Sequence, residues 1–106
     1  MTEKMYSLKF TEKAADDLDN IYSYISEQLF NSIAARNLIN NIESSLIRLK
    51  SFPYSCSFVS DEILKGKGYR KLIVDNYIVF YLIDETNEQV IVMRVLYGAQ
   101  EYQDLL

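Results

Sequence analysis

Apolar residues repeat with two different periods along the chain of 106 residues. In residues 5–10, MYSLKF, apolar and polar residues alternate, which predicts a half-buried strand. Thr11 then stands where a helix N-cap is expected. Steps of three and four residues follow, which predict a helix over residues 12–29. Its apolar face is expected to hold Ala14, Leu18, Ile21, Tyr22, Ile25 and Leu29.

A second amphipathic pattern predicts a second helix. Asn31 can cap it, and the dipeptide Phe52-Pro53 ends it, because the residue before a proline disfavours the helical conformation. The connection between the two helices is about two residues long, so they must pack antiparallel as a hairpin. Its apolar positions are Ala35, Leu38, Ile39, Ile42, Leu46 and Leu49.

The second half of the chain predicts an antiparallel meander. Residues 53–68 show no clean period, and Gly66-Lys67-Gly68 marks a flexible loop. Short turns at Asp75-Asn76 and Thr86-Asn87 join the apolar runs that follow. These runs, predicted to be strands, are residues 69–74, 77–83 and 89–96.

The strands are apolar on both faces. One face is therefore expected to pack on the helices, and the other to be covered by something else or to stay partly exposed. We expect that second side to offer arginine and aromatic rings to another macromolecule. The tail, residues 99–106, fits one helical turn or an extended segment. The order β-α-α-β-β-β predicts one α+β domain over residues 1–106, with a helical hairpin on a mainly antiparallel sheet of three or four strands.

Composition narrows the possible functions. With no histidine and one cysteine, Cys56, the chain offers no nitrogen- or thiolate-rich metal site and no internal disulfide, and we expect no cofactor. A net charge of −4 argues against sequence-specific DNA binding by this chain alone. Neither a membrane span nor a signal peptide is expected, which suits a cytoplasmic protein. Nine tyrosines favour an interface with another protein.

Three segments carry a resemblance to a known family. They are MYSLKF followed by TEKAADDLDNIYSYI, the helix end LIRLKSFP, and GYRKLIVDNYIVFYLIDETNEQVIVMRVLYGAQEY. In order and spacing they resemble the RelE/ParE superfamily of toxins from bacterial type II toxin–antitoxin modules, and most of all its ParE-like branch. The resemblance implies a toxin neutralised by a cognate antitoxin.

The family's targets imply two activities. ParE-like members are held to poison DNA gyrase, and RelE-like members to cut mRNA on the ribosome as metal-independent ribonucleases. This chain departs from the commoner motif at Tyr97, where a histidine is usual, and at Gln100, where a basic residue is usual. Both departures remove groups that could bind phosphate or move protons, so we expect a protein target, DNA gyrase. Open alternatives are a ribosome-dependent mRNA endonuclease and a degenerate module that binds its antitoxin without toxicity.

Two arginines are candidates for function. Arg70 fits a phosphate contact or a clamp on a transition state, because guanidinium is always charged and can bind in a bidentate way. It equally fits a strand arginine that reaches solvent or pairs with a carboxylate. Arg94 interrupts an apolar strand, which costs free energy unless its charge is paired. It could line a partner surface together with Arg70, and a structural ion pair is the favoured alternative.

Aromatic and polar residues complete the candidate site. Tyr97 would be catalytic with the two arginines only in a RelE-like enzyme, because a tyrosine, with a reference pKa of about 10, is a poor base at neutral pH. We interpret RVLYGAQEY, residues 94–102, as an edge strand and tail covered by a partner. The acidic run of Glu12, Asp16, Asp17 and Asp19 is expected to be a solvated face. The candidates for partner binding are Tyr69, Arg70, Tyr77, Arg94, Tyr97, Gln100 and Tyr102.

Overall fold

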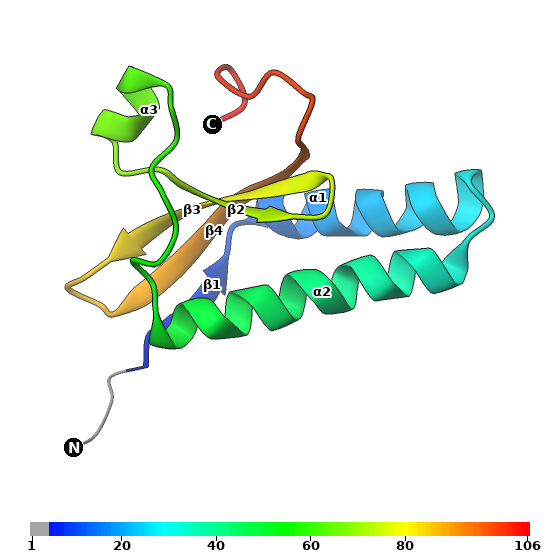
Figure 1. Ribbon diagram of the computed structural model, residues 1–106, viewed down its shortest axis with the longest axis horizontal. Helices are drawn as coiled ribbons and strands as arrows, with labels where there is room; N and C mark the ends of the chain where they lie inside the picture. The colour runs from blue at the N-terminus through cyan, green and yellow to red at the C-terminus, as the bar shows by residue number, and fades with distance from the viewer. Residues whose placement is uncertain (1–4) are drawn as a thin grey trace.

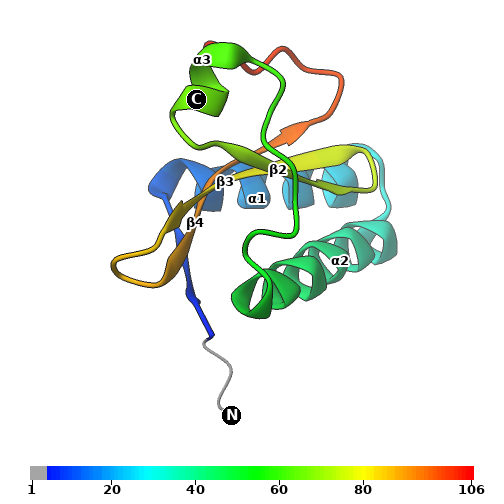
Figure 2. The ribbon, with the colours of Figure 1, turned by 60° about the vertical axis from the view of Figure 1, so that its left-hand side comes forward.

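A four-stranded sheet lies between a helical hairpin and a smaller layer made of a short helix and the C-terminal tail (Figures 1 and 2). This computed structural model describes residues 5–106; residues 1–4, part of the segment in which no signal peptide was expected, lie outside that range. The predicted α+β class and order of elements are confirmed. The elements are β1 (Ser7–Phe10), α1 (Glu12–Ser23), η1 (Tyr24–Gln28), α2 (Ser32–Ser51), α3 (Glu62–Gly66), β2 (Arg70–Val74), β3 (Tyr77–Asp84) and β4 (Gln89–Tyr97).

Side-chain caps fix the start of both long helices, as the sequence predicts. The hydroxyl of Thr11 accepts a hydrogen bond from the backbone N–H of Ala14 at 3.1 Å, and the amide oxygen of Asn31 accepts one from Ala34 at 3.0 Å. The predicted helix 12–29 is α1 extended by the π-helical turn η1. Phe30, at φ 51°, then reverses the chain into the antiparallel α2. Within residues 5–106, no helix is both long and apolar enough to cross a membrane.

The strand order β1-β4-β3-β2 places β4 inside the sheet. β2, β3 and β4 pair antiparallel, whereas β1 pairs parallel to β4 and reaches only Val92. The prediction that residues 94–102 begin with an edge strand is therefore wrong as stated. The prediction failed because β4 pairs with the distant strand β1, and no local pattern reveals this pairing. Among residues 5–106, however, no strand pairs with β4 on that side beyond Val92.

The helical hairpin buries the first face of the sheet. Most residues of the predicted apolar stripes supply this core, and the alternate residues of β3 and β4 meet them. Tyr22 and Leu29, expected on the apolar face of the first helix, are instead exposed. Leu29 follows the π-helical turn η1, which breaks the period that would place it on that face. Tyr81 is fully buried there and donates its hydroxyl to the carbonyl of Pro53 at 3.0 Å. The other buried members are Ala14, Leu38, Ile42, Leu46, Leu49, Val74, Val79, Val90, Val92 and Val95.

The second face is covered in large part by the chain itself. α3 and the tail lie over this face of the sheet (Figure 1). Phe80 and Leu96 pack there in a cluster with Val59, Leu64 and Tyr69. The expectation that this side lies open to a partner is thus wrong for this half of the face. The segment 53–68, in which the sequence shows no period, contains α3, capped by Asp61 through hydrogen bonds from the N–H groups of Ile63 and Leu64. The loop expected at Gly66-Lys67-Gly68 is shorter than predicted, because Gly66 is the last residue of α3 and a turn follows it. A helix of five residues is too short to show a period.

Candidate functional site

Arg94 and Asp17 form a bidentate ion pair between β4 and α1. Nε of Arg94 donates to Oδ2 of Asp17 at 2.7 Å, and Nη2 donates to Oδ1 at 2.8 Å. The third nitrogen, Nη1, donates to the carbonyl of Leu105 in the tail at 3.1 Å. The hydrogen bonds with Asp17 raise the pKa of Arg94 above its ordinary value. The guanidinium is therefore charged, and its nitrogens are engaged inside the protein.

Asp17 also accepts a backbone hydrogen bond from the edge of β4. Its Oδ2 accepts a hydrogen bond from the backbone N–H of Val95 at 2.9 Å, at the stretch of β4 that β1 does not reach. The side chain of Asp17 is only 11% exposed, so its expected place on a solvated face is wrong. A charge inside the apolar strand signalled that Arg94 needs a partner. The sequence could not choose among the neighbouring carboxylates, because it does not show that α1 runs along the edge of β4.

A hollow of about 330 Å³ lies beside this ion pair. Tyr97 is 51% exposed and meets the ring of Tyr77 edge-on, with the ring centres 5.7 Å apart and the planes at 73°. Burial raises the pKa of Tyr77, and the nearby phenols of Tyr24 and Tyr97 add to this effect. Gln100 lines the same hollow. We call this region the Arg94 corner: Asp17, Tyr24, Tyr77, Arg94, Tyr97 and Gln100.

Arg70 lies in different surroundings, at the start of β2. Its guanidinium carbon is 4.0 Å from the ring centre of Phe58 and 5.3 Å from that of Tyr54. Its Nη1 donates to the carbonyl of Cys56 at 2.6 Å. Such stacking orients an arginine while leaving its edges able to bind. Unlike Arg94, it has no carboxylate within 4.0 Å of its guanidinium among residues 5–106.

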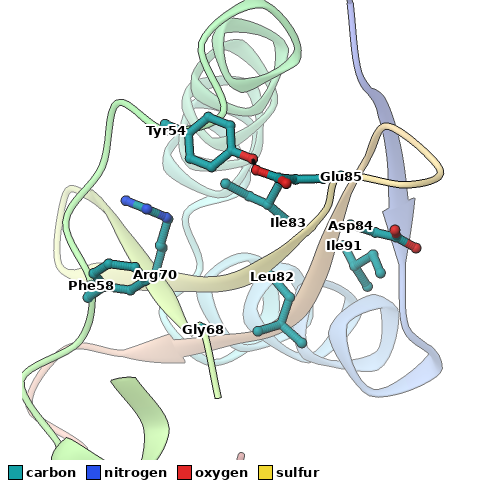
Figure 3. A pocket seen from close by; sticks show the side chains of 9 residues that line it. All are labelled: Tyr54, Phe58, Gly68, Arg70, Leu82, Ile83, Asp84, Glu85 and Ile91. Atoms are coloured by element: carbon teal, nitrogen blue, oxygen red, sulfur yellow. Dashed lines mark hydrogen bonds between the residues drawn. The ribbon is translucent and has the colours of Figure 1, made fainter. Parts of the chain in front are cut away.

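Arg70 forms part of one wall of a hollow of about 520 Å³ (Figure 3). Half-buried Leu82 and Ile91, which face each other in the register of β3 and β4, line it on the sheet. Asp84 and Glu85, at and just after the end of β3, provide a second, acidic wall. We call it the Arg70 hollow: Tyr54, Phe58, Gly68, Arg70, Leu82, Ile83, Asp84, Glu85 and Ile91.

The acidic wall is held in place by hydrogen bonds. The hydroxyl of Tyr54 donates to the carboxylate of Glu85, and this bond is the main cause that raises the pKa of Tyr54. Asn87 donates to Asp84 through its side chain at 2.8 Å and its backbone at 3.1 Å, which lowers the pKa of that carboxyl. Asp84 is therefore ionised at neutral pH.

Residues 8–102 match the family described as the ParE toxin of the type II toxin–antitoxin system parDE. The chain belongs to the ParE toxin family. It thereby belongs to the RelE/ParE superfamily, as the sequence resemblance predicted. No curated protein sequence matches the chain.

Solved structures share the ParE-type fold. A structure from the chromosomal ParDE system of P. aeruginosa is 23% identical, with a TM-score of 0.71 over 89% of this chain and 97% of that one. The RelBE2 toxin–antitoxin complex of Mycobacterium tuberculosis contains a chain that is 21% identical, with a TM-score of 0.63 over 88% and 98%. A free E. coli RelE mutant is 17% identical, with a TM-score of 0.58 over 90% and 85%.

In this ParE-family chain, the predicted site residues do not form one cluster. Arg70 and Arg94, expected to line one surface together, line two different hollows. Tyr69 is only 6% exposed, within the cluster under α3. Tyr102 packs on Phe80, with the ring centres 4.8 Å apart. Tyr77, Arg94, Tyr97 and Gln100 share the Arg94 corner, whereas Tyr69 meets Arg94 at a separate, smaller hollow of about 140 Å³. The walls around Arg70 were missed because Tyr54 and Phe58 come from a segment without a period.

Proposed function

We propose that this ParE-family chain is a toxin that a cognate antitoxin neutralises and that acts in the cytoplasm by binding DNA gyrase. Family membership supports the toxin role. A cognate antitoxin is supported by analogy with the similar P. aeruginosa ParDE system and the M. tuberculosis RelBE2 complex. The choice of gyrase follows from the family resemblance and from the chemistry of the Arg94 corner.

One observation carries the choice of a protein target. The guanidinium of Arg94 is engaged by both carboxylate oxygens of Asp17 and by the carbonyl of Leu105. Cleavage of RNA through its 2′-hydroxyl calls for a proton acceptor, a proton donor and a cation that meets the developing phosphorane charge. In the Arg94 corner the cation is already paired, and the chain contains no histidine that could move the protons.

The surface of the corner suits a protein better than a nucleic acid. Half-exposed tyrosines such as Tyr24 and Tyr97 combine a large contact area with a polar tip, which is favoured at protein interfaces. The net charge of −4 opposes the long-range attraction to phosphate on which binding to RNA or DNA depends.

The test is a supercoiling assay on purified gyrase with relaxed plasmid. We expect the purified chain to inhibit supercoiling and to raise the amount of linear plasmid, and the co-expressed antitoxin to relieve both effects. A parallel translation reaction with purified ribosomes and a defined mRNA reports the alternative activity. If mRNA is cut at ribosomes while gyrase is unaffected, the chain is a ribonuclease instead. Expression that neither slows growth nor affects either reaction would leave only an antitoxin-binding module.

One observation favours the ribonuclease as the second candidate. Arg70 is stacked, oriented and without a carboxylate within 4.0 Å among residues 5–106, so it could contact a phosphate. Arg70, Arg94 and Tyr97 would then be the catalytic candidates. Against this role, the acidic wall of the same hollow repels a polyanion.

A further inference from the structure

The second face of the sheet is covered unevenly. α3 and the tail pack over Phe80 and Leu96, but the end of the face that carries Leu82 and Ile91 borders the Arg70 hollow (Figure 3). These two side chains are half-buried and lie directly opposite each other across β3 and β4. Together they form an apolar floor that can take an apolar side chain from outside.

Arg70 stands at one side of this floor with spare donors. Phe58 and Tyr54 hold the plane of its guanidinium, and the carbonyl of Cys56 accepts one of its N–H groups. Its guanidinium makes no other hydrogen bond to residues 5–106. Because guanidinium carries five N–H donors, several are free for a carboxylate, which it can bind through two parallel bonds.

Two carboxylates, Asp84 and Glu85, also line the hollow. Glu85 is fixed by the hydroxyl of Tyr54 (Figure 3), and Asp84 is fixed by Asn87. Neither lies within 4.0 Å of any lysine or arginine nitrogen among residues 5–106. Lys9, on β1, is close enough to help lower the pKa of Asp84 but forms no ion pair with it. The hollow therefore presents a positive group and two carboxylates around an apolar floor, with Tyr54 between Arg70 and Glu85.

We infer that the Arg70 hollow is a docking site for an extended segment of a protein partner that carries an acidic side chain, an apolar one and a basic one. The acidic side chain binds Arg70, the apolar one lies on Leu82 and Ile91, and the basic one binds Asp84 and Glu85. The inference needs a protein partner, as in the proposed function, but not gyrase in particular.

Charge complementarity selects this occupant over others. A nucleic acid would gain Arg70 but would bring its phosphates against two fixed carboxylates. A purely apolar peptide would leave both charged walls without partners. A segment with opposite charges at its two ends satisfies both walls, and the apolar side chain between them is removed from water.

The experiment is a selection of phage-displayed random 12-residue peptides on the immobilised full chain, with the Arg70→Gln variant as counter-selection. We expect enriched peptides to carry Asp or Glu and Lys or Arg on opposite sides of an apolar residue. A synthetic peptide of the enriched sequence should bind at least tenfold more weakly to Arg70→Gln and to Glu85→Gln, as measured by fluorescence anisotropy. Glu85→Gln keeps an acceptor for Tyr54, so this variant is expected to fold.

Combining variants of the chain with variants of the peptide tests which peptide residue binds which wall of the hollow. Replacing the acidic residue of the peptide by Gln should remove most of the difference between the wild-type chain and Arg70→Gln. Replacing its basic residue should do the same for Glu85→Gln. Arg36→Gln and Glu43→Gln remove the same charges from exposed positions of α2 and should leave binding within twofold.

Three results would overturn the inference. The first is enrichment of peptides that bind Arg70→Gln as tightly as the wild type. The second is tight binding of a 12-nucleotide single-stranded RNA that depends on Arg70 and is unaffected by Glu85→Gln. The third is a dimer in sedimentation experiments that both variants dissociate, which would make a second copy of this chain the occupant. None of these measurements involves gyrase, so failure of the gyrase assay leaves the peptide result intact, and the reverse holds as well.

Discussion

Arg94 and Arg70 are the two arginines of the sheet, and the protein holds them by different means. Arg94 is fixed by a carboxylate, so its charge is neutralised inside the fold. Arg70 is fixed by two aromatic rings and one carbonyl, so its charge remains uncompensated at an open hollow. The contrast teaches that the position of a guanidinium and the use of its charge are separate. An ion pair fixes the position of the guanidinium and neutralises its charge. Stacking on aromatic rings fixes its position and leaves the charge available to a partner.

The largest expected effect comes from Asp17→Ala. It leaves Arg94 without its carboxylate and the N–H of Val95 without an acceptor, and we expect the free energy of unfolding to fall by about 3 kcal/mol. Urea titration followed by circular dichroism measures this change. Asp16→Ala is the control, because Asp16 is an exposed neighbour on the same helix and should change stability by less than about 0.5 kcal/mol. Equal losses in the two variants would mean that Arg94 does not depend on Asp17.

Arg70→Ala should affect function more than stability. If the free charge of Arg70 binds a partner, the protein concentration needed for toxicity should rise about tenfold, which corresponds to about 1.4 kcal/mol of binding free energy. Growth of cells with graded expression, normalised to the amount of folded protein, measures it. Lys71→Ala, at the adjacent position, serves as control and should weaken toxicity less. Equal toxicity of both variants would remove Arg70 from the site.

Tyr81→Phe tests how the wall of the Arg70 hollow is anchored. Tyr81 opposes Arg70 in the sheet, and its hydroxyl binds the carbonyl of Pro53, next to Tyr54. Loss of this buried hydrogen bond should cost about 1 kcal/mol at pH 8. Urea unfolding at that pH, compared with the exposed control Tyr97→Phe, measures the cost. A loss no larger than that of the control would mean that the bond does not anchor the segment.

The stability difference between the wild type and Tyr81→Phe is expected to depend on pH in the alkaline range. Burial raises the pKa of Tyr81 in the folded chain, whereas in the unfolded chain the phenol ionises near its ordinary pKa of about 10. The folded state then binds more protons than the unfolded state, so stability falls as pH rises above 10, by at most about 1.4 kcal/mol per pH unit from this residue. The advantage of the wild type over Tyr81→Phe should therefore shrink between pH 10 and 11. An unchanged difference between the two unfolding free energies would contradict this cause.

Phe58→Leu has the smallest expected effect. It keeps an apolar side chain but removes the ring that lies 4.0 Å from the guanidinium carbon of Arg70, at an expected cost of about 0.5 kcal/mol. Combining it with Arg70→Gln in a double-mutant cycle isolates the stacking contribution. A coupling energy of zero would show that the ring does not hold Arg70.

The helical hairpin and the strands could be predicted because each has a period that its own residues display. The caps at Thr11 and Asn31 and the stripes of α1 and α2 are local features, and they fold as expected except at Tyr22 and Leu29, which are exposed. The parallel pairing of β1 with β4 joins residues about 80 positions apart, and no local pattern encodes it. The edge position of Asp17 follows from that pairing, so it was missed for the same reason.

The two hollows show the same limit of prediction from local sequence patterns. Tyr97 and Tyr77 could be predicted as neighbours because they end and begin strands joined by a meander. The rings around Arg70 come from residues 53–58, which have no regular structure in the sequence pattern. The cover over Phe80 comes from a five-residue helix and an irregular tail, which carry too few residues for a period to emerge.

The carboxylate of Asp17 has a consequence for the behaviour of the protein at high concentration. Open strand edges invite pairing between molecules and lead to aggregation. By occupying the N–H of Val95, a negatively charged side chain takes the place that a foreign strand would need on this stretch of β4. The strands at the two ends of the sheet, β1 and β2, span only four and five residues. The carboxylate of Asp17 and the short outer strands are features that disfavour pairing of this sheet with strands of other molecules.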